Sequence, residues 1–193
     1  MADLKPATSA LRDAVPAASA EVSLILKALA FAAVKHRDQR RKDKRASPYI
    51  NHPIELANVL WHEGGVTDPV VIAAALLHDT VEDTETSWQE LRGGFGDEVA
   101  DVVLEVTDVK WLKKASRKRL QVAKAKYASE RARLVKLADK ICNLRDVAAH
   151  PPSGWPLERR RQYFDWAKEV INQVRGTHPV LERKFDEAYA LKP

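Results

Sequence analysis

The sequence predicts an all-α protein. The chain has only seven glycines in 193 residues and is rich in Ala, Leu, Lys, Arg and Glu, which favour helices. Apolar residues recur at helical spacing in several segments, and no segment shows the alternation of a half-buried strand. Hydrophobic residues make up 45% of the chain and charged residues 31%, as in ordinary globular proteins. We therefore expect a single helical domain over residues 21–193, preceded by a mobile leader at 1–20 that is rich in Ala, Ser, Thr and Pro.

Helices in the first half of the chain are indicated by apolar periodicity and by helix-capping residues. The first is expected at 21–37, followed by a basic loop, and the second at 53–63, with Pro53 in its first turn and Gly64-Gly65 at its end. A third helix, capped by Thr67 or Asp68, is expected to run through residues 78–83. Ser87 and Glu90 form a capping box for a short helix ended by Gly93-Gly94, and another helix starts at Asp97.

The second half of the chain is also expected to be helical. Residues 110–126 are strongly basic and predict a loop that gives way to a helix. Three further helices are expected at 131–149, stopped by Pro151-Pro152, at 156–175, and at 179–191.

Charge and cysteine content narrow the possible locations and partners. Cys142 is the single cysteine and no signal-like segment is visible, so a cytoplasmic location is expected. The apolar runs fall short of the ~20 residues that a membrane span needs, so no membrane partner is expected. The net charge of +5 suits a polyanionic partner, either a small phosphorylated ligand or a nucleic acid. Nothing in the sequence indicates an oligomeric state.

The strongest chemical signal is the segment His78-Asp79-Thr80-Val81-Glu82-Asp83. It follows seven apolar residues, 71–77, which are expected to carry it into the interior on a helix. On that helix His78 lies above Glu82 and Asp79 above Asp83. His78 and Asp79 could then share a metal ion, with Glu82 and Asp83 facing whatever the metal binds. The alternative, solvated acids at a helix end, is less favoured for the full pattern.

A second candidate metal ligand is Asp139. Leu134, Leu137, Ile141 and Leu144 form one apolar stripe of its helix, while Asp139, Asn143 and Asp146 lie roughly opposite. Val135 and Cys142 flank the polar stripe, which indicates a central helix, and a central carboxylate needs a positive partner. The alternative is a solvated helix face.

The fourth ligand favoured by the sequence is His52, at a helix entrance. His36 lies in a basic context and His62 at a helix end, while His150 and His178 suit capping or surface roles. Two imidazoles and two carboxylates suit Mn²⁺, Fe²⁺ or Zn²⁺ better than Ca²⁺.

Four motifs in chain order resemble the metal-dependent HD phosphohydrolases, and within them the (p)ppGpp hydrolase domain of the RelA/SpoT family. They are residues 36–42, 48–53, 75–83 and 137–145. Gly154-Trp155 and the segment around Tyr163 further resemble the stand-alone small alarmone hydrolases, including the metazoan type. Asp146 and residues 44–47 depart from the long bifunctional enzymes, whose synthetase region is absent, so alarmone synthesis is not expected.

The resemblance implies an all-helical HD-domain bundle that hydrolyses the 3′-diphosphate of ppGpp or pppGpp to GDP or GTP and pyrophosphate. It implies Mn²⁺ held by His52, His78, Asp79 and Asp139. It also implies catalytic acids at Glu82 and Asp83, and nucleotide contacts from Arg41, Lys42 and Asn143.

The expected mechanism is attack of water on a phosphoryl group. A divalent cation makes water a stronger nucleophile, and Glu82 and Asp83 would orient that water and move its proton. Arg40 to Lys42 would hold the phosphates, and Arg41 could stack on guanine. One alternative is another nucleotide substrate, such as the 2′-phosphate of NADPH. A second is a basic helical module that binds nucleic acid, which the absence of a recognisable nucleic-acid motif disfavours.

Overall fold

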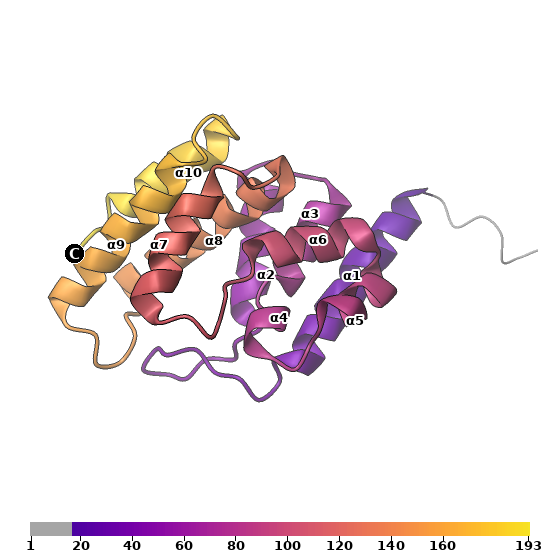
Figure 1. The fold of residues 1–193 in the computed structure, drawn as a ribbon, viewed down its shortest axis with the longest axis horizontal. Helices are drawn as coiled ribbons and strands as arrows, with labels where there is room; N and C mark the ends of the chain where they lie inside the picture. The colour runs from indigo at the N-terminus through magenta and orange to yellow at the C-terminus, as the bar shows by residue number, and fades with distance from the viewer. Residues whose placement is uncertain (1–16) are drawn as a thin grey trace, which may run out of the picture.

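The computed structural model describes residues 17–193 and confirms the all-α prediction (Figure 1). No strand occurs in that range, where the only β-type pairing is an isolated bridge between Arg40 and Pro48. None of the helices in this range is long and apolar enough to cross a membrane. The helices are α1 (Ala17–Lys35), α2 (Asn51–Asn58), the π-helix η1 (Val59–Glu63), α3 (Pro69–Leu77), α4 (Thr80–Asp83), α5 (Trp88–Phe95), α6 (Asp97–Val106), α7 (Lys114–Ala125), α8 (Glu130–Ala149), α9 (Leu157–Asn172) and α10 (Pro179–Tyr189).

Two helices, α3 and α8, form the centre of the molecule. Every residue of the apolar run 71–77 is buried in α3, which packs against α1, α2, α6 and α8. Helix α8 packs in turn against α2, α6, α9 and α10. The three leucines and one isoleucine of its predicted apolar stripe are buried, as are Val135 and Cys142. The prediction that the helix carrying Asp139 is central is therefore confirmed.

Side-chain caps begin four of the helices. Asp68 accepts a hydrogen bond from the Val70 amide at the start of α3, and Ser87 accepts one from Glu90 at the start of α5, as predicted. His178, for which a capping or surface role was expected, accepts from the Leu181 amide through Nδ1 at the start of α10. Ser129 caps α8, which starts at Glu130 rather than at Arg131. These short-range hydrogen bonds satisfy amides that the first helical turn leaves unpaired.

Several predicted boundaries are wrong. Helix α1 begins at Ala17 rather than Glu21, so the end of the predicted leader is helical, and residues 1–16 of that leader lie outside the described residues. Helix α2 begins at Asn51 rather than Pro53, and it continues as the π-helix η1 over 59–63. Helix α5 runs through Gly93 and Gly94 and ends at Phe95, and the following Gly96 has a φ of 85°, which favours a residue without a Cβ.

The predicted helix through residues 78–83 is interrupted. Helix α3 stops at Leu77, and α4 restarts at Thr80. The hydroxyl of Thr80 donates to the Leu77 carbonyl at 2.6 Å, in competition with the backbone ladder. The expectation of one continuous helix is therefore wrong, although the Asp83 amide still donates to the Asp79 carbonyl at 2.8 Å, one turn away. His78 and Asp79 instead occupy the turn between two helices.

The remaining boundaries are close to those predicted. The basic segment forms a loop up to Lys113 and then α7, as expected. Helices α9 and α10 end at Asn172 and Tyr189, before the predicted 175 and 191. Helix ends fray, so small shifts of this kind carry little structural consequence.

Candidate active site

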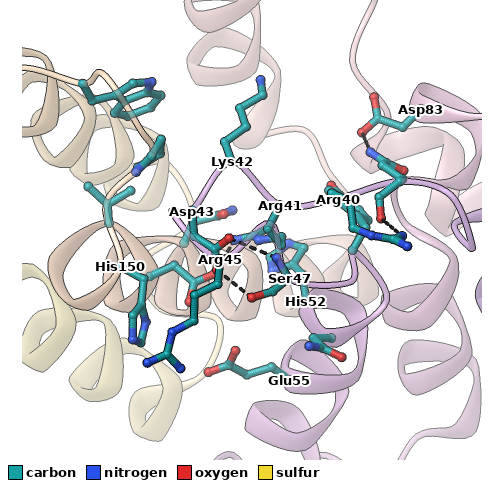
Figure 2. A pocket seen from close by; sticks show the side chains of 18 of the residues that line it. Arg40, Arg41, Lys42, Asp43, Arg45, Ser47, His52, Glu55, Asp83 and His150 are labelled. Atoms are coloured by element: carbon teal, nitrogen blue, oxygen red, sulfur yellow. Dashed lines mark hydrogen bonds and ion pairs between the residues drawn. The ribbon is translucent and has the colours of Figure 1, made fainter.

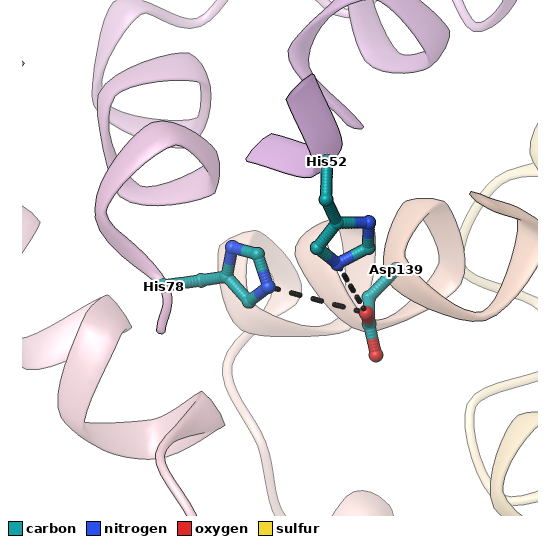
Figure 3. A group of neighbouring side chains, drawn as sticks. All are labelled: His52, His78 and Asp139. Atoms are coloured by element: carbon teal, nitrogen blue, oxygen red, sulfur yellow. Dashed lines mark ion pairs between the residues drawn. The ribbon is translucent and has the colours of Figure 1, made fainter. Parts of the chain in front are cut away.

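Three side chains of metal-ligand type converge from three helices (Figure 3). His52 is the second residue of α2, His78 follows the last residue of α3, and Asp139 lies in the middle of α8. The Nε2 atom of His52 lies 3.3 Å from Asp139 Oδ1, and that of His78 lies 4.0 Å from the same oxygen. Both imidazoles are buried, and the structure thus brings together three of the four predicted ligands.

The hydrogen bonding of His78 tests whether this group suits a cation. Its Nδ1 lies 2.8 Å from the Ala75 carbonyl, which can only accept, so Nδ1 carries a proton. Within residues 17–193 the buried Nε2 has no hydrogen-bond partner, and it faces the carboxylates of Asp79 and Asp139. Burial lowers the pKa of His78, but these carboxylates raise it to about 9. Either a proton or a cation must therefore stand between Nε2 and the acids, and two imidazoles with carboxylates suit a borderline divalent cation.

Asp79, the fourth predicted ligand, lies beside this group. One of its oxygens is 3.0 Å from His78 Nε2 and accepts a hydrogen bond from the Tyr49 hydroxyl. Burial raises its pKa, but the facing histidines hold the pKa below its ordinary value. Asp79 is thus ionised and adjacent to the three convergent side chains.

Asp139 is oriented by its own helix. Lys140 donates to Oδ2 at 2.7 Å, and the Asn143 amide donates to Oδ1. Burial raises the pKa of Asp139, but Lys140 and the two histidines hold it well below its ordinary value. Only Oδ1 faces the imidazoles, so a cation there would meet one oxygen of this carboxylate.

The two predicted catalytic acids have different surroundings. Glu82 accepts hydrogen bonds from the Asp108 amide at 3.1 Å and from Arg117 at 3.3 Å. Burial, followed by the charges of Asp108 and Asp79, raises the pKa of Glu82 to about 7. Asp83 accepts from the Gln39 amide at 3.0 Å, and Lys110 lies 3.5 Å away. The partners Lys110 and Arg117 come from the basic segment, to which the sequence assigned no role.

A pocket of about 630 Å³ opens beside these residues (Figure 2). The basic loop crosses it, with Asp83 at one end and His150 at the other. The three predicted nucleotide contacts, Arg41, Lys42 and Asn143, all line the pocket, and so does His52 of the convergent group. The remaining lining residues are Gln39, Arg40, Asp43, Arg45, Ser47, Tyr49, Asn51, Glu55, Asp146, Val147, Pro152, Trp155 and Tyr163. A pocket that is lined by four Lys or Arg side chains and four carboxylates thus reaches the candidate metal group at His52.

Arg41 is held in a fixed orientation at this pocket. Its guanidinium forms an ion pair with Asp146 and lies 5.7 Å from the centroid of the Tyr49 ring. Burial opposes its charge, but Asp146 and Tyr49 leave its pKa above the ordinary value. Arg41 is therefore a preorganised cation.

An aromatic wall of the pocket was not assigned a role from the sequence. Trp155 and Tyr163 have ring centroids 5.6 Å apart, and Lys114 and Arg159 lie over Trp155 at 5.6 Å and 4.3 Å. Trp155 lies just before α9, and Arg159 and Tyr163 belong to it, so only the approach of Lys114 from α7 is a long-range contact. The resemblance at Gly154-Trp155 and Tyr163 was the only sequence signal for this wall.

The other histidines lie apart from the convergent group. His36 is buried, and its Nδ1 contacts the Gln39 side chain at 2.6 Å. His62 belongs to η1 and is exposed. His150 ends α8 and lines the pocket at its far side.

The chain is similar to known proteins over most of its length. A family profile described as an HD domain matches residues 28–163. Guanosine-3′,5′-bis(diphosphate) 3′-pyrophosphohydrolase MESH1 of Xenopus tropicalis is 53% identical over 171 residues, which cover 89% of this chain and 96% of the relative. The protein of the same name from Homo sapiens is 53% identical over 169 residues, covering 88% and 94%. A solved structure described as a metazoan ortholog of SpoT that hydrolyzes ppGpp has a TM-score of 0.85 and 49% identity, covering 87% of this chain and 94% of that one.

Proposed function

Since the chain belongs to the HD-domain family, we propose that it hydrolyses the 3′-diphosphate of ppGpp and pppGpp, leaving GDP or GTP and pyrophosphate. The observation that carries the proposal is the pocket that the basic loop crosses and that reaches His52 of the convergent group. Arg40, Arg41, Lys42 and Arg45 line this pocket and offer cations to a bis(diphosphate), and the proposed acid Asp83 lines it as well. The two relatives described above carry this activity in their names.

We propose Mn²⁺ as the bound cation, with His52, His78, Asp79 and Asp139 as its ligands. The convergence of two Nε2 atoms on Asp139 Oδ1, with Asp79 next to His78, supports this set. When bound, a divalent cation lowers the pKa of water and neutralises charge on phosphoryl oxygens. The protein's part is to present neutral imidazoles and ionised carboxylates at fixed positions.

The basic loop holds the nucleotide in this proposal. Lys42 offers a mobile ammonium to the phosphates, while Arg41 presents a planar guanidinium, fixed by Asp146, on which guanine can stack. Asn143 already donates to Asp139 and lines the pocket, so its amide lies between the nucleotide and the metal group. The ammonium and the planar guanidinium thus suit a phosphorylated nucleoside.

Glu82 and Asp83 supply proton transfer. A pKa of about 7 lets Glu82 accept or release a proton near neutral pH, which is the range where acid–base catalysis is efficient. Asp83 lines the pocket and is held by Gln39, so it can orient the attacking water.

The test is product analysis with ppGpp, pppGpp and NADPH as parallel substrates of Mn²⁺-loaded protein. We expect GDP and pyrophosphate from ppGpp, and loss of turnover after chelation. Orthophosphate from NADPH with intact ppGpp would instead support the 2′-phosphatase alternative. Retention on RNA or DNA at physiological salt, without turnover of any nucleotide, would support the nucleic-acid alternative.

A further inference from the structure

The loop between His36 and Tyr49 brings two side-chain donors onto the turn that carries the acids. Within the loop, the Tyr49 amide donates to the Gln39 carbonyl at 3.1 Å, and the Arg41 amide donates to the Ser47 carbonyl at 2.8 Å. Gln39 and Tyr49 therefore lie side by side on two hydrogen-bonded segments of the loop. We infer that Gln39 and Tyr49, with His36 behind them, are positioning residues for Asp83 and Asp79.

The orientation of the Gln39 side chain follows from its two partners. The ionised carboxylate of Asp83 only accepts hydrogen bonds, so the group 3.0 Å from it is the Gln39 NH₂. The side-chain oxygen Oε1 of Gln39 then faces His36 Nδ1 at 2.6 Å, and that nitrogen must donate. His36 is 1% exposed, and its ring lies 4.9 Å from that of Tyr49. A buried histidine thus fixes the amide that fixes Asp83.

Tyr49 plays the matching part for Asp79. Its hydroxyl donates to the Asp79 carboxylate. An ionised carboxylate only accepts hydrogen bonds, so the phenol is the donor of this contact. Asp79 and Asp83 belong to one turn, since the Asp83 amide donates to the Asp79 carbonyl at 2.8 Å. Two carboxylates on one turn are therefore held by two neighbouring donors of the loop.

Lys110, the cation near Asp83, does not orient the Asp83 carboxylate as Gln39 does. Lys110 lies 3.5 Å from Asp83, but its Nζ donates to the Glu82 carbonyl at 2.6 Å and its side chain is 60% exposed. It contributes charge rather than orientation. Arg41 and Lys42 follow Gln39 closely in the chain, so the loop that holds the nucleotide in our proposed function also aligns the acid that acts on it. The inference rests on that proposed function.

The experiment for the Gln39 contact compares Gln39→Leu with Gln39→Glu on Mn²⁺-loaded protein and ppGpp. We expect kcat to fall about tenfold or more in both, with KM and metal content near the parent values. Glu has the size of Gln but lacks a donor and repels Asp83, so Gln39→Glu should be at least as impaired as Gln39→Leu. A merely structural role predicts the opposite order. Gln162→Leu is the matched control, because it removes a Gln–Glu158 hydrogen bond of 3.0 Å on the exposed side of α9.

The Tyr49 contact is tested without turnover, by titrating metal-free protein with Mn²⁺ alone. Tyr49→Phe removes one hydroxyl and should weaken Mn²⁺ binding about tenfold. Tyr189→Phe, whose hydroxyl donates to Asp165 at 3.0 Å on the surface, should bind like the parent. Parent-like kcat in both Gln39 variants, or parent-like Mn²⁺ affinity in Tyr49→Phe, would contradict the inference. Absence of ppGpp turnover in the parent would contradict the proposed function, and the Mn²⁺ titration would still test the Tyr49 contact.

Discussion

Glu82 and Asp83 are neighbours in sequence, yet their carboxylates face different partners. Glu82 is held by the Asp108 amide and Arg117, whereas Asp83 is held by Gln39 at the pocket. Burial and nearby acids raise the pKa of Glu82 to about 7. The sequence identified both residues as acids, but the surroundings that distinguish them come from segments 26 to 44 positions away in the chain.

Glu82→Gln should reduce turnover of ppGpp by on the order of 10²-fold with metal content unchanged, because it removes only the proton-transfer group. A general base must be ionised, so parent activity should rise with pH through a pKa of about 7, or somewhat lower once a bound cation favours the anion. The kcat–pH profile measures this, and the variant should lack the rise. The same acidic limb in Glu82→Gln would assign it to another group.

Arg41→Lys separates charge from shape at the nucleotide pocket. We expect Arg41→Gln to lower kcat/KM by an amount equivalent to roughly 1–3 kcal/mol. If the planar guanidinium stacks on guanine, Arg41→Lys should show most of the same decrease in kcat/KM. Lys44 lies outside the pocket lining, so Lys44→Gln is the control and should be nearly silent. Steady-state kinetics at physiological salt give the comparison. Full activity in Arg41→Lys would show that Arg41 acts through charge alone.

At the scale of elements, the π-helix η1 depends on Gly64. Within η1, the Leu60 carbonyl accepts a hydrogen bond from the Val66 amide at 2.9 Å, and the chain passes close to the buried Leu181 of α10. A Cβ on Gly64 would lie 2.8 Å from both the Leu60 oxygen and a Leu181 methyl carbon. The extra residue of the π-helix was not predictable, because Val59–Glu63 has an ordinary helical pattern and the close contact is with a distant helix.

Gly64→Ala and Gly93→Ala should change stability in opposite directions. Gly64→Ala overpacks the contact with Leu181 and should lower the free energy of unfolding by about 1–3 kcal/mol. Gly93 lies inside α5 with nothing within 4 Å of an added Cβ, so Gly93→Ala should raise it by about 0.5–1 kcal/mol. Urea denaturation of the two variants measures both changes. Equal midpoints would contradict this account of the two glycines.

At the scale of the whole molecule, local signals predicted the elements and long-range packing decided the site. Caps such as Asp68 and Ser87 act within one turn, so helix starts could be predicted from neighbouring residues. The run Val71–Leu77 and the helix that carries Asp139 could be placed in the centre, because each has apolar residues on more than one face of its helix. The pairing of Arg117 with Glu82 could not be predicted, since it joins two helices whose paired residues are 35 positions apart in the chain.

The candidate metal group also links three parts of the fold, because its members come from α2, the end of α3 and α8. A cation that binds only this folded arrangement stabilises the protein by mass action, by about 2.7 kcal/mol at 100 times its Kd. We expect Mn²⁺ to raise the melting temperature of metal-free protein in a concentration-dependent manner. The shift reports binding without requiring catalysis.

Asp139→Ala should abolish both that shift and ppGpp turnover, because it removes the carboxylate on which both imidazoles converge. The baseline stability of this variant also changes, since Lys140 loses its partner, so the Mn²⁺-dependent difference is the decisive quantity. Asp146→Ala makes the same chemical change farther along α8, at the pocket but outside the convergent group, and should retain the shift. Thermal unfolding of the parent and both variants across a Mn²⁺ titration checks this. An undiminished shift in Asp139→Ala would place the metal elsewhere and remove Asp139 from the ligand set.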